Sequence, residues 1–143
     1  MKTAIIVCTH AVMAEGLKSA VEMICGPQED FYAIGLAQRE GLDHVGAALT
    51  QTLTDLTNQG KKALVFCDLY GATPFNASYV ALCRQSAFVI TGVNLPMLLE
   101  TVISREDEDD LIALGQSAMD GGHEGIKMVE TLLEVGSDET EEF

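Results

Sequence analysis

Short apolar runs alternate along the chain with segments in which apolar residues recur every three or four positions. The runs have the length and continuity of strands covered on both faces of a sheet; they lie at residues 3–8, 31–36, 63–67 and 88–91. The segments between and after them have the period of amphipathic helices; they lie at residues 13–24, 42–56, 74–84, 96–103 and 111–119. This alternation predicts an α/β fold with a doubly wound, mostly parallel open sheet and helices on both faces.

Glycine and proline mark the expected ends of the helices. Residues 26–27, Gly-Pro, are expected to end the first helix. Pro74 and Pro96 fit the first turns of two later helices, where a missing N–H costs nothing. The glycine pair at residues 121–122 is expected to end the last helix.

The segment after this glycine pair supports two interpretations. Ile126, Met128 and Glu130 alternate as in a strand, whereas Ile126, Val129 and Leu133 share one face of a helix. Periodicity does not decide between the two.

The composition predicts a single domain with a sizeable core. We find no repeat and no linker, and expect one domain over residues 1–135 and an acidic flexible tail over residues 136–143. Apolar residues make up 48% of the 143, but no run approaches the roughly 18–20 residues of a membrane span. The first apolar stretch is too short for a signal peptide, so a cytoplasmic location is expected. Four cysteines without CxxC spacing are expected to be reduced and buried.

Acidic residues outnumber basic ones, and much of the excess lies in two segments. The 22 Asp and Glu against 8 Lys and Arg give a formal net charge of −14, which disfavours binding to nucleic acid or anionic membranes. Nine of the acids lie in residues 106–110 and 138–142, so the rest of the chain is only mildly acidic. We expect the acidic surface to steer a less acidic docking protein, whose association rate would fall with added salt.

Polar residues gather where predicted strands end. In an open parallel sheet, ligands bind beyond the carboxyl ends of the strands, where helix N-termini offer unpaired N–H groups. His10 ends the first strand and Asp68 follows the third. A carboxylate bonded to one imidazole nitrogen fixes the tautomer and leaves the other nitrogen nucleophilic. The pair predicts a histidine that can accept a phosphoryl group, although Asp68 also fits a helix cap or an Asx-turn.

The residue types missing near these strand ends narrow the chemistry. Lys and Arg are absent from the three segments at residues 9–13, 68–76 and 91–97. A bound phosphoryl group would therefore be held by backbone N–H groups and hydroxyls, chiefly that of Thr73. The sequence has no nucleotide-binding or serine-hydrolase motif, and no cofactor is implied. A metal site is not expected because strand alternation places Cys67 and Asp68 on opposite faces, and His44 and His123 are assigned no role.

Three motifs resemble a known family. They are Val7-Cys8-Thr9-His10, the Gly-Ala-Thr-Pro-Phe-Asn core of residues 68–76, and the Gly-Val-Asn-Leu-Pro-Met-Leu-Leu-Glu stretch at residues 92–100. Their order and spacing are similar to those of the mannose-family (mannose, fructose, sorbose, N-acetylgalactosamine) IIA components of the bacterial sugar phosphotransferase system. The resemblance runs from residue 1 to about residue 130.

The resemblance implies a function in phosphoryl transfer. His10 would accept a phosphoryl group from the histidine-containing phosphocarrier protein and pass it to a separate IIB component, which serves a membrane IIC/IID permease. Asp68 would orient His10 so that its Nε2 attacks. The other site residues would be Gly71, Ala72 and Thr73 for phosphoryl binding, and Tyr70 and Asn94 for partner contact.

The resemblance also implies a homodimer in which a C-terminal antiparallel strand is exchanged between subunits, placing residues 124–130 in that strand. Two departures stand close to the site: the family often has glycine where Ala11 and Ala72 stand. An alanine fits without strain if φ is negative at its position.

Two other functions fit parts of the same pattern. A similar domain serves as phosphoryl carrier to a dihydroxyacetone kinase, which keeps the chemistry and changes the recipient. A regulatory or ligand-binding α/β module without transfer activity is the alternative from a different class.

Overall fold

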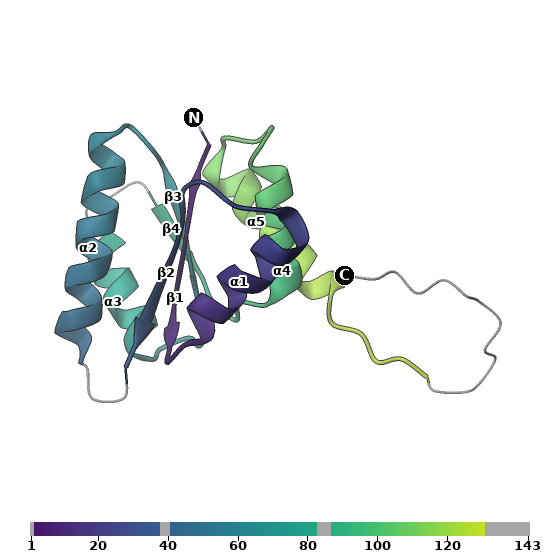
Figure 1. The fold of residues 1–143 in the computed structure, drawn as a ribbon, viewed down its shortest axis with the longest axis horizontal. Helices are drawn as coiled ribbons and strands as arrows, with labels where there is room; N and C mark the ends of the chain where they lie inside the picture. Colours follow the sequence, from purple (N-terminus) through teal and green to yellow (C-terminus); the bar gives the residue numbers. More distant parts are fainter. Residues whose placement is uncertain (1, 38–40, 83–86, 131–143) are drawn as a thin grey trace.

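The computed structural model describes residues 2–37, 41–82 and 87–130. Four strands form one parallel sheet: β1 (Ala4–His10), β2 (Phe31–Leu36), β3 (Ala63–Cys67) and β4 (Ala87–Ile90), in the spatial order β2-β1-β3-β4. Helices α2 (Leu42–Asn58) and α3 (Thr73–Leu82) cover one face; α1 (Met13–Cys25), α4 (Leu95–Ser104) and α5 (Leu111–Glu124) cover the other (Figure 1). The predicted doubly wound α/β fold is confirmed. None of the described helices combines the length and apolar character needed to cross a membrane.

The continuous apolar runs of β1 and β3 feed two separate cores. Successive side chains of a strand point to opposite faces of the sheet. Ile5 and Val7 therefore pack on the side of α1, α4 and α5, whereas Ile6 and Cys8 pack on the side of α2 and α3. Because both faces are covered, these strands need apolar residues at every position rather than at alternate ones.

The last helix continues past the glycine pair that was expected to end it. α5 extends to Glu124, so the prediction of a break at residues 121–122 is wrong. A Cβ at Gly121 would lie 2.6 Å from the Cβ of Glu100 in α4, and one at Gly122 would lie 2.8 Å from the Cε of Met97. The glycines allow α4 and α5 to pack closely, and this packing offsets a helix-propensity cost of about 1 kcal/mol per glycine.

The segment at residues 124–130, for which the sequence allowed a strand or a helix, is helical only at its first residue. Glu124 ends α5, and residues 126–130 are neither helix nor strand. They lead away from the body of the molecule (Figure 1). Three of their apolar side chains are exposed, namely Ile126, Met128 and Val129. The exchanged strand stays a prediction, and the tail at residues 136–143 lies outside the described residues.

The prediction that all four cysteines are buried is wrong at one position. Cys8 and Cys67 are buried, as expected for residues of inner strands, and both are free thiols. Cys25 is exposed because it ends α1 on the solvent side. Cys83 lies outside the described residues.

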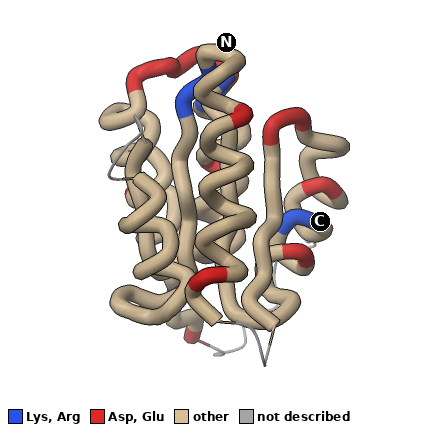
Figure 2. The backbone as a smooth tube through the Cα atoms, turned by 90° about the vertical axis from the view of Figure 1, so that its left-hand side faces the viewer, with Lys and Arg blue, Asp and Glu red and all other residues tan. Residues whose placement is uncertain are grey.

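The acidic run at residues 106–110 lies at the amino ends of the strands. Lys2, just before β1, pairs with Glu106 at 2.7 Å, and the Nζ of Lys62, just before β3, donates to the Asp109 carbonyl at 2.9 Å. Figure 2 shows the run beside the N-terminus. His10 is the last residue of β1 and therefore lies at the opposite, carboxyl ends of the strands. Steering of a partner by this run would therefore act from a distance, and its salt dependence stays a prediction.

A buried arginine joins the end of α4 to the start of β2. Arg105 is only 2% exposed, and its guanidinium donates to the carbonyls of Thr3 (3.1 Å), Asp30 (3.2 Å) and Glu29 (2.7 Å). It also donates to the side chain of Gln28 at 3.0 Å. The guanidinium therefore bonds to backbone carbonyls just before the neighbouring strands β1 and β2.

The variant Arg105→Met is expected to lower the free energy of unfolding by about 2 kcal/mol. The reason is that the carbonyls of Thr3 and Glu29 lose their donors while the replacement keeps much of the apolar volume. Urea unfolding measures the change, with Lys127→Met as the control, since Lys127 is largely exposed. Equal stability of the two variants would show that water replaces the guanidinium without cost.

Candidate active site

The site begins with a histidine at the carboxyl end of the central strand pair. His10 is the last residue of β1, and Asp68 directly follows the neighbouring strand β3. Parallel pairing aligns the two strand ends, with Cys8 opposite Cys67. The Nδ1 of His10 consequently lies 2.7 Å from the Oδ2 of Asp68. The His10 side chain is 47% exposed and that of Asp68 13%, so the imidazole is open to solvent while its partner is enclosed.

Asp68 is held by further hydrogen bonds. Its Oδ2 also accepts the backbone N–H of His10 at 3.0 Å, and its Oδ1 accepts the N–H of Leu69 at 3.0 Å. Asp68 thus bonds to the ring of His10 and to the first N–H of the loop, which is one residue on rather than the two or three of an Asx-turn or a helix cap. Burial raises the pKa of Asp68, but the backbone N–H and the ring of His10 together lower the pKa below its ordinary value.

The ionisation of Asp68 decides the tautomer of His10. A lowered pKa keeps the carboxyl group ionised at neutral pH, and an ionised carboxylate only accepts hydrogen bonds. The Nδ1 of His10 must therefore carry the proton in the 2.7 Å bond. In a neutral ring this leaves the lone pair on Nε2, which makes Nε2 the nucleophilic atom.

The turn after His10 has an unusual backbone. Ala11 has a φ of +49°, in the left-handed region that alanine rarely adopts. Its N–H donates to the Leu36 carbonyl of β2 at 2.8 Å. Alanine was expected to fit without strain only where φ is negative, so the backbone of Ala11 is strained. Ala72 is not among the described residues of positive φ.

Buried Thr9 supports this turn, a role that the sequence reasoning missed. Its hydroxyl oxygen accepts the N–H of Ala14 at 2.8 Å, in the first turn of α1. Thr9 is fully buried. Threonine just before a helix is a common capping signal, but here the bond spans five residues, which is longer than the usual cap.

The predicted phosphoryl-binding residues form the loop that leads from Asp68 into α3. Gly71 has a φ of +79°, which favours glycine, and its carbonyl accepts from the side chain of Asn76 at 3.2 Å. Ala72 accepts the N–H of Asn76 at 2.9 Å, and Thr73 is the first residue of α3. The loop is thus held by the helix that it precedes, and its N–H groups lie at a helix N-terminus.

Tyr70 lies on the surface of this loop. It is 76% exposed, and its ring centroid lies 4.8 Å from that of Phe75. Its exposure agrees with a contact to another protein, which stays a prediction.

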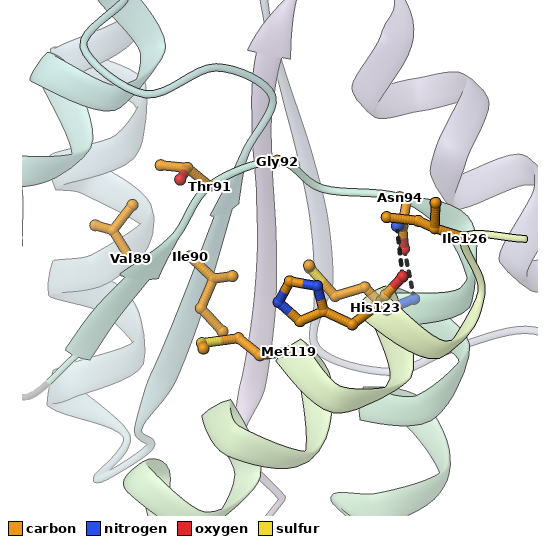
Figure 3. Close-up of a pocket in the computed structure, with 10 residues that line it drawn as sticks. Val89, Ile90, Thr91, Gly92, Asn94, Met119, His123 and Ile126 are labelled. Carbon is orange, nitrogen blue, oxygen red and sulfur yellow. Dashed lines mark hydrogen bonds between the residues drawn. The ribbon is translucent and has the colours of Figure 1, made fainter.

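Asn94 has a structural role at the third strand end. Its Oδ1 accepts the N–H of Met97 at 2.9 Å, which caps α4, and its Nδ2 donates to the Gly122 carbonyl at 3.1 Å (Figure 3). The loop that carries Asn94 turns back over the sheet after β4, because the N–H of Val93 donates to the Cys67 carbonyl at the end of β3 at 3.1 Å. Partner contact by Asn94 stays a prediction.

The other two histidines lie in helices rather than at a strand end. His44 is exposed in the first turn of α2. His123 belongs to the last turn of α5 rather than to a turn after it, and its ring points into a cavity of about 390 Å³ beside Ile90 and Met119 (Figure 3). Among the residues that the structure describes, no three His, Cys, Asp or Glu side chains are grouped so as to hold a metal ion.

Comparison with known proteins agrees with the motifs. Residues 4–118 match the family model EIIA-man, described as "PTS system fructose IIA component". The "PTS system mannose-specific EIIAB component" of Escherichia coli K12 is 36% identical over 131 residues, covering 89% of this chain and 39% of that protein. The chain therefore spans about two fifths of that relative. The "PTS system sorbose-specific EIIA component" of Lacticaseibacillus casei is 39% identical over 103 residues, 70% of this chain and 72% of that one.

Solved structures share the fold over nearly their full length. The phosphotransferase component EIIA from Streptococcus agalactiae superposes with a TM-score of 0.80 at 32% identity, covering 88% of this chain and 96% of that one. The mannose/sorbose specific IIA subunit from Enterococcus faecalis has a TM-score of 0.83 at 27% identity, covering 91% and 96%. The chain therefore belongs to the EIIA-man family, the mannose-family IIA components of the sugar phosphotransferase system.

Proposed function

We propose that this chain is a phosphoryl carrier in which His10 accepts the group from the histidine-containing phosphocarrier protein and passes it to a IIB component. The observation that carries the proposal is the 2.7 Å bond between the Nδ1 of His10 and the Oδ2 of Asp68 on a half-exposed ring. It leaves Nε2 free to react and places a carboxylate beside the ring that gains charge.

The reaction is an in-line displacement at phosphorus. The lone pair of the His10 Nε2 forms a new N–P bond while the P–N bond to the histidine of the phosphocarrier breaks. The electron pair of the broken bond returns to the departing imidazole. The His10 ring becomes more positive as its bond forms, and the carboxylate of Asp68 stabilises this charge through Nδ1. Transfer to the IIB component repeats the displacement with His10 as the donor.

The loop after Asp68 is suited to the phosphoryl oxygens. Backbone N–H groups of Gly71, Ala72 and Thr73 precede the first hydrogen bonds of α3, where a helix favours negative charge. The hydroxyl of Thr73 adds one donor. A site without Lys or Arg holds the group weakly enough to release it to the next protein.

The phosphocarrier and the IIB component would cover an apolar surface around the histidine. Val12, Leu69 and Tyr70 are 79%, 60% and 76% exposed, and each lies one or two residues after His10 or Asp68 in the chain. Covering them removes water from the reacting atoms and contributes to binding without fixed charge pairs.

Labelling with the phosphorylated phosphocarrier tests the proposal. We expect one acid-labile phosphoryl group per chain, mapped by mass spectrometry to His10, and its release on addition of a IIB protein. Transfer to a dihydroxyacetone kinase subunit instead would change the recipient and keep the chemistry. A chain that takes up no label would exclude the carrier function and favour a regulatory module.

We also propose that the chain forms a homodimer through residues 126–130. β4 is one of the two edge strands of the described sheet, and apolar cavities of about 390 and 470 Å³ adjoin it. Phe88 in this strand is 48% exposed. The segment at residues 126–130 of a second copy would pair antiparallel with β4 and place Met128 and Val129 in these cavities.

The variant Val129→Asp is expected to weaken dimerisation at least roughly 30-fold, because a buried carboxylate costs about 2 kcal/mol or more. Sedimentation over a range of concentrations measures the dissociation constant. Lys127→Asp, which changes a polar position of the same segment, is the control and should retain the dimer. A monomeric wild-type chain at high concentration would overturn this proposal.

A further inference from the structure

The backbone that carries His10 folds across the end of strand β2. Thr9 lies opposite Gly35 in the register of β1 and β2, and the chain then turns at Ala11, whose N–H donates to the Leu36 carbonyl at 2.8 Å. This turn places the Ala11 carbonyl directly over Gly35. We infer that Gly35 is a positioning residue for His10, an assignment that rests on the proposed function for its effect on phosphoryl transfer.

The close approach leaves no room for a side chain. A Cβ at Gly35 would lie 2.4 Å from the carbonyl oxygen of Ala11 and 3.6 Å from its carbonyl carbon, whereas real Cβ contacts are essentially never shorter than 3.0 Å. The obstructing atoms belong to the backbone, so no rotation of a side chain relieves the contact. A methyl group at position 35 must displace the Ala11 peptide itself.

The displacement would reach His10 because the turn is held on both sides. The N–H of Ala11 is bonded to β2, and the N–H of His10 is bonded to the Oδ2 of Asp68 beside β3. Ala11 already has a φ of +49°, in a small allowed region that leaves little freedom for adjustment. Moving its peptide therefore disturbs either the backbone or the ring bond between His10 and Asp68.

The same geometry predicts that positions 11 and 35 are coupled. A glycine at position 11 has far more backbone freedom than alanine, so its carbonyl can turn away from a Cβ at position 35. Ala11→Gly should consequently rescue Gly35→Ala. Such rescue distinguishes positioning through the turn from a general loss of packing at β2, because a glycine at position 11 restores no packing at β2 and Gly35 itself is exposed.

The experiment is a four-member cycle of wild type, A11G, G35A and the A11G/G35A double variant. Three quantities are measured: the labelling rate at saturating phosphorylated phosphocarrier, the ¹⁵N chemical shifts of the His10 ring nitrogens without phosphocarrier, and the free energy of unfolding. Gly46→Ala is the control, because a Cβ at this helical glycine meets nothing within 4 Å.

We expect G35A to slow labelling roughly tenfold, since small misplacements of reacting groups have effects of this size. Its ring nitrogens should shift away from the single Nδ1–H tautomer, while A11G and G46A stay within about twofold of wild type. The double variant should regain most of the rate and the wild-type shifts. A G35A variant with wild-type rate and shifts, or a double variant as slow as G35A, would overturn the inference.

Two further outcomes are also decisive. If G35A does not fold, a double variant that folds and labels as fast as A11G supports the coupling between positions 11 and 35. A double variant that does not fold, or that labels tenfold more slowly than A11G, overturns it. If wild type takes up no label, the proposed function fails, but the ring-nitrogen shifts of the four variants still test the positioning role of Gly35.

Discussion

Replacing His10 with alanine is expected to abolish uptake of the phosphoryl group from the phosphorylated phosphocarrier. In the proposed mechanism the attacking atom is Nε2 of His10, and alanine at this position provides no nucleophile in its place. The side chain is 47% exposed, and Asp68 keeps the N–H groups of residue 10 and Leu69 as donors, so the free energy of unfolding should change by less than about 1 kcal/mol. Autoradiography of the labelled chain measures the uptake.

The remaining two histidines provide the controls for this experiment. His44→Ala and His123→Ala each remove an imidazole of a helix, to which the proposed mechanism gives no role, and both should label as fast as wild type. Label that persists in H10A, or is lost in H123A, would show that His10 is not the residue that accepts the phosphoryl group.

Asparagine at position 68 is expected to slow the transfer by roughly 100-fold, or about 2.7 kcal/mol of transition-state stabilisation. An amide that turns its NH₂ group towards Nδ1 selects the tautomer with the proton on Nε2, which is the atom that must attack. An amide that turns its oxygen there keeps the tautomer but lacks the charge that stabilises the developing positive ring. Single-turnover labelling measures the rate, and Asp43→Asn in α2 is the matched control.

The pH dependence of stability provides a second measure of the Asp68 prediction. Because folding lowers its pKa, Asp68 contributes stability that is fully present above the ordinary value of 3.8 and is lost as the pH falls through the lowered value. The D68N variant has no such titration. The difference in unfolding free energy between wild type and D68N should therefore shrink in acid. An unchanged transfer rate in D68N would show that Asp68 only organises the loop and takes no part in the transfer.

The elements were predictable to within a few residues wherever local pattern and tertiary contacts agree. The apolar runs at residues 31–36 and 63–67 became β2 and β3 with the expected bounds. The exception was α5, where the glycines at residues 121–122 read locally as a break. Their helical state depends on close packing against Glu100 and Met97 of α4, which no local pattern reveals.

The central pair of the site was predictable because of its place in the sheet. Parallel strands end at one edge, so a histidine after one buried run and an aspartate after another were expected at the same level. Their 2.7 Å contact confirms this expectation. Asn94 follows the fourth strand by the same rule, but its side chain caps α4 and bonds to the Gly122 carbonyl of α5, contacts that the sequence does not state.

The sequence by itself determined the doubly wound α/β class, the apolar strands covered on both faces, and the placement of His10 and Asp68 at neighbouring strand ends. These properties follow from periodicity and from the position of polar residues at strand ends, which are local. Only the tertiary structure decided the strand order, the 2.7 Å contact between the Nδ1 of His10 and Asp68, and the left-handed backbone of Ala11, whose carbonyl lies over Gly35. Each of these depends on distances between segments far apart in the chain, because backbone conformation and protonation respond to the neighbours that folding brings within a few ångströms.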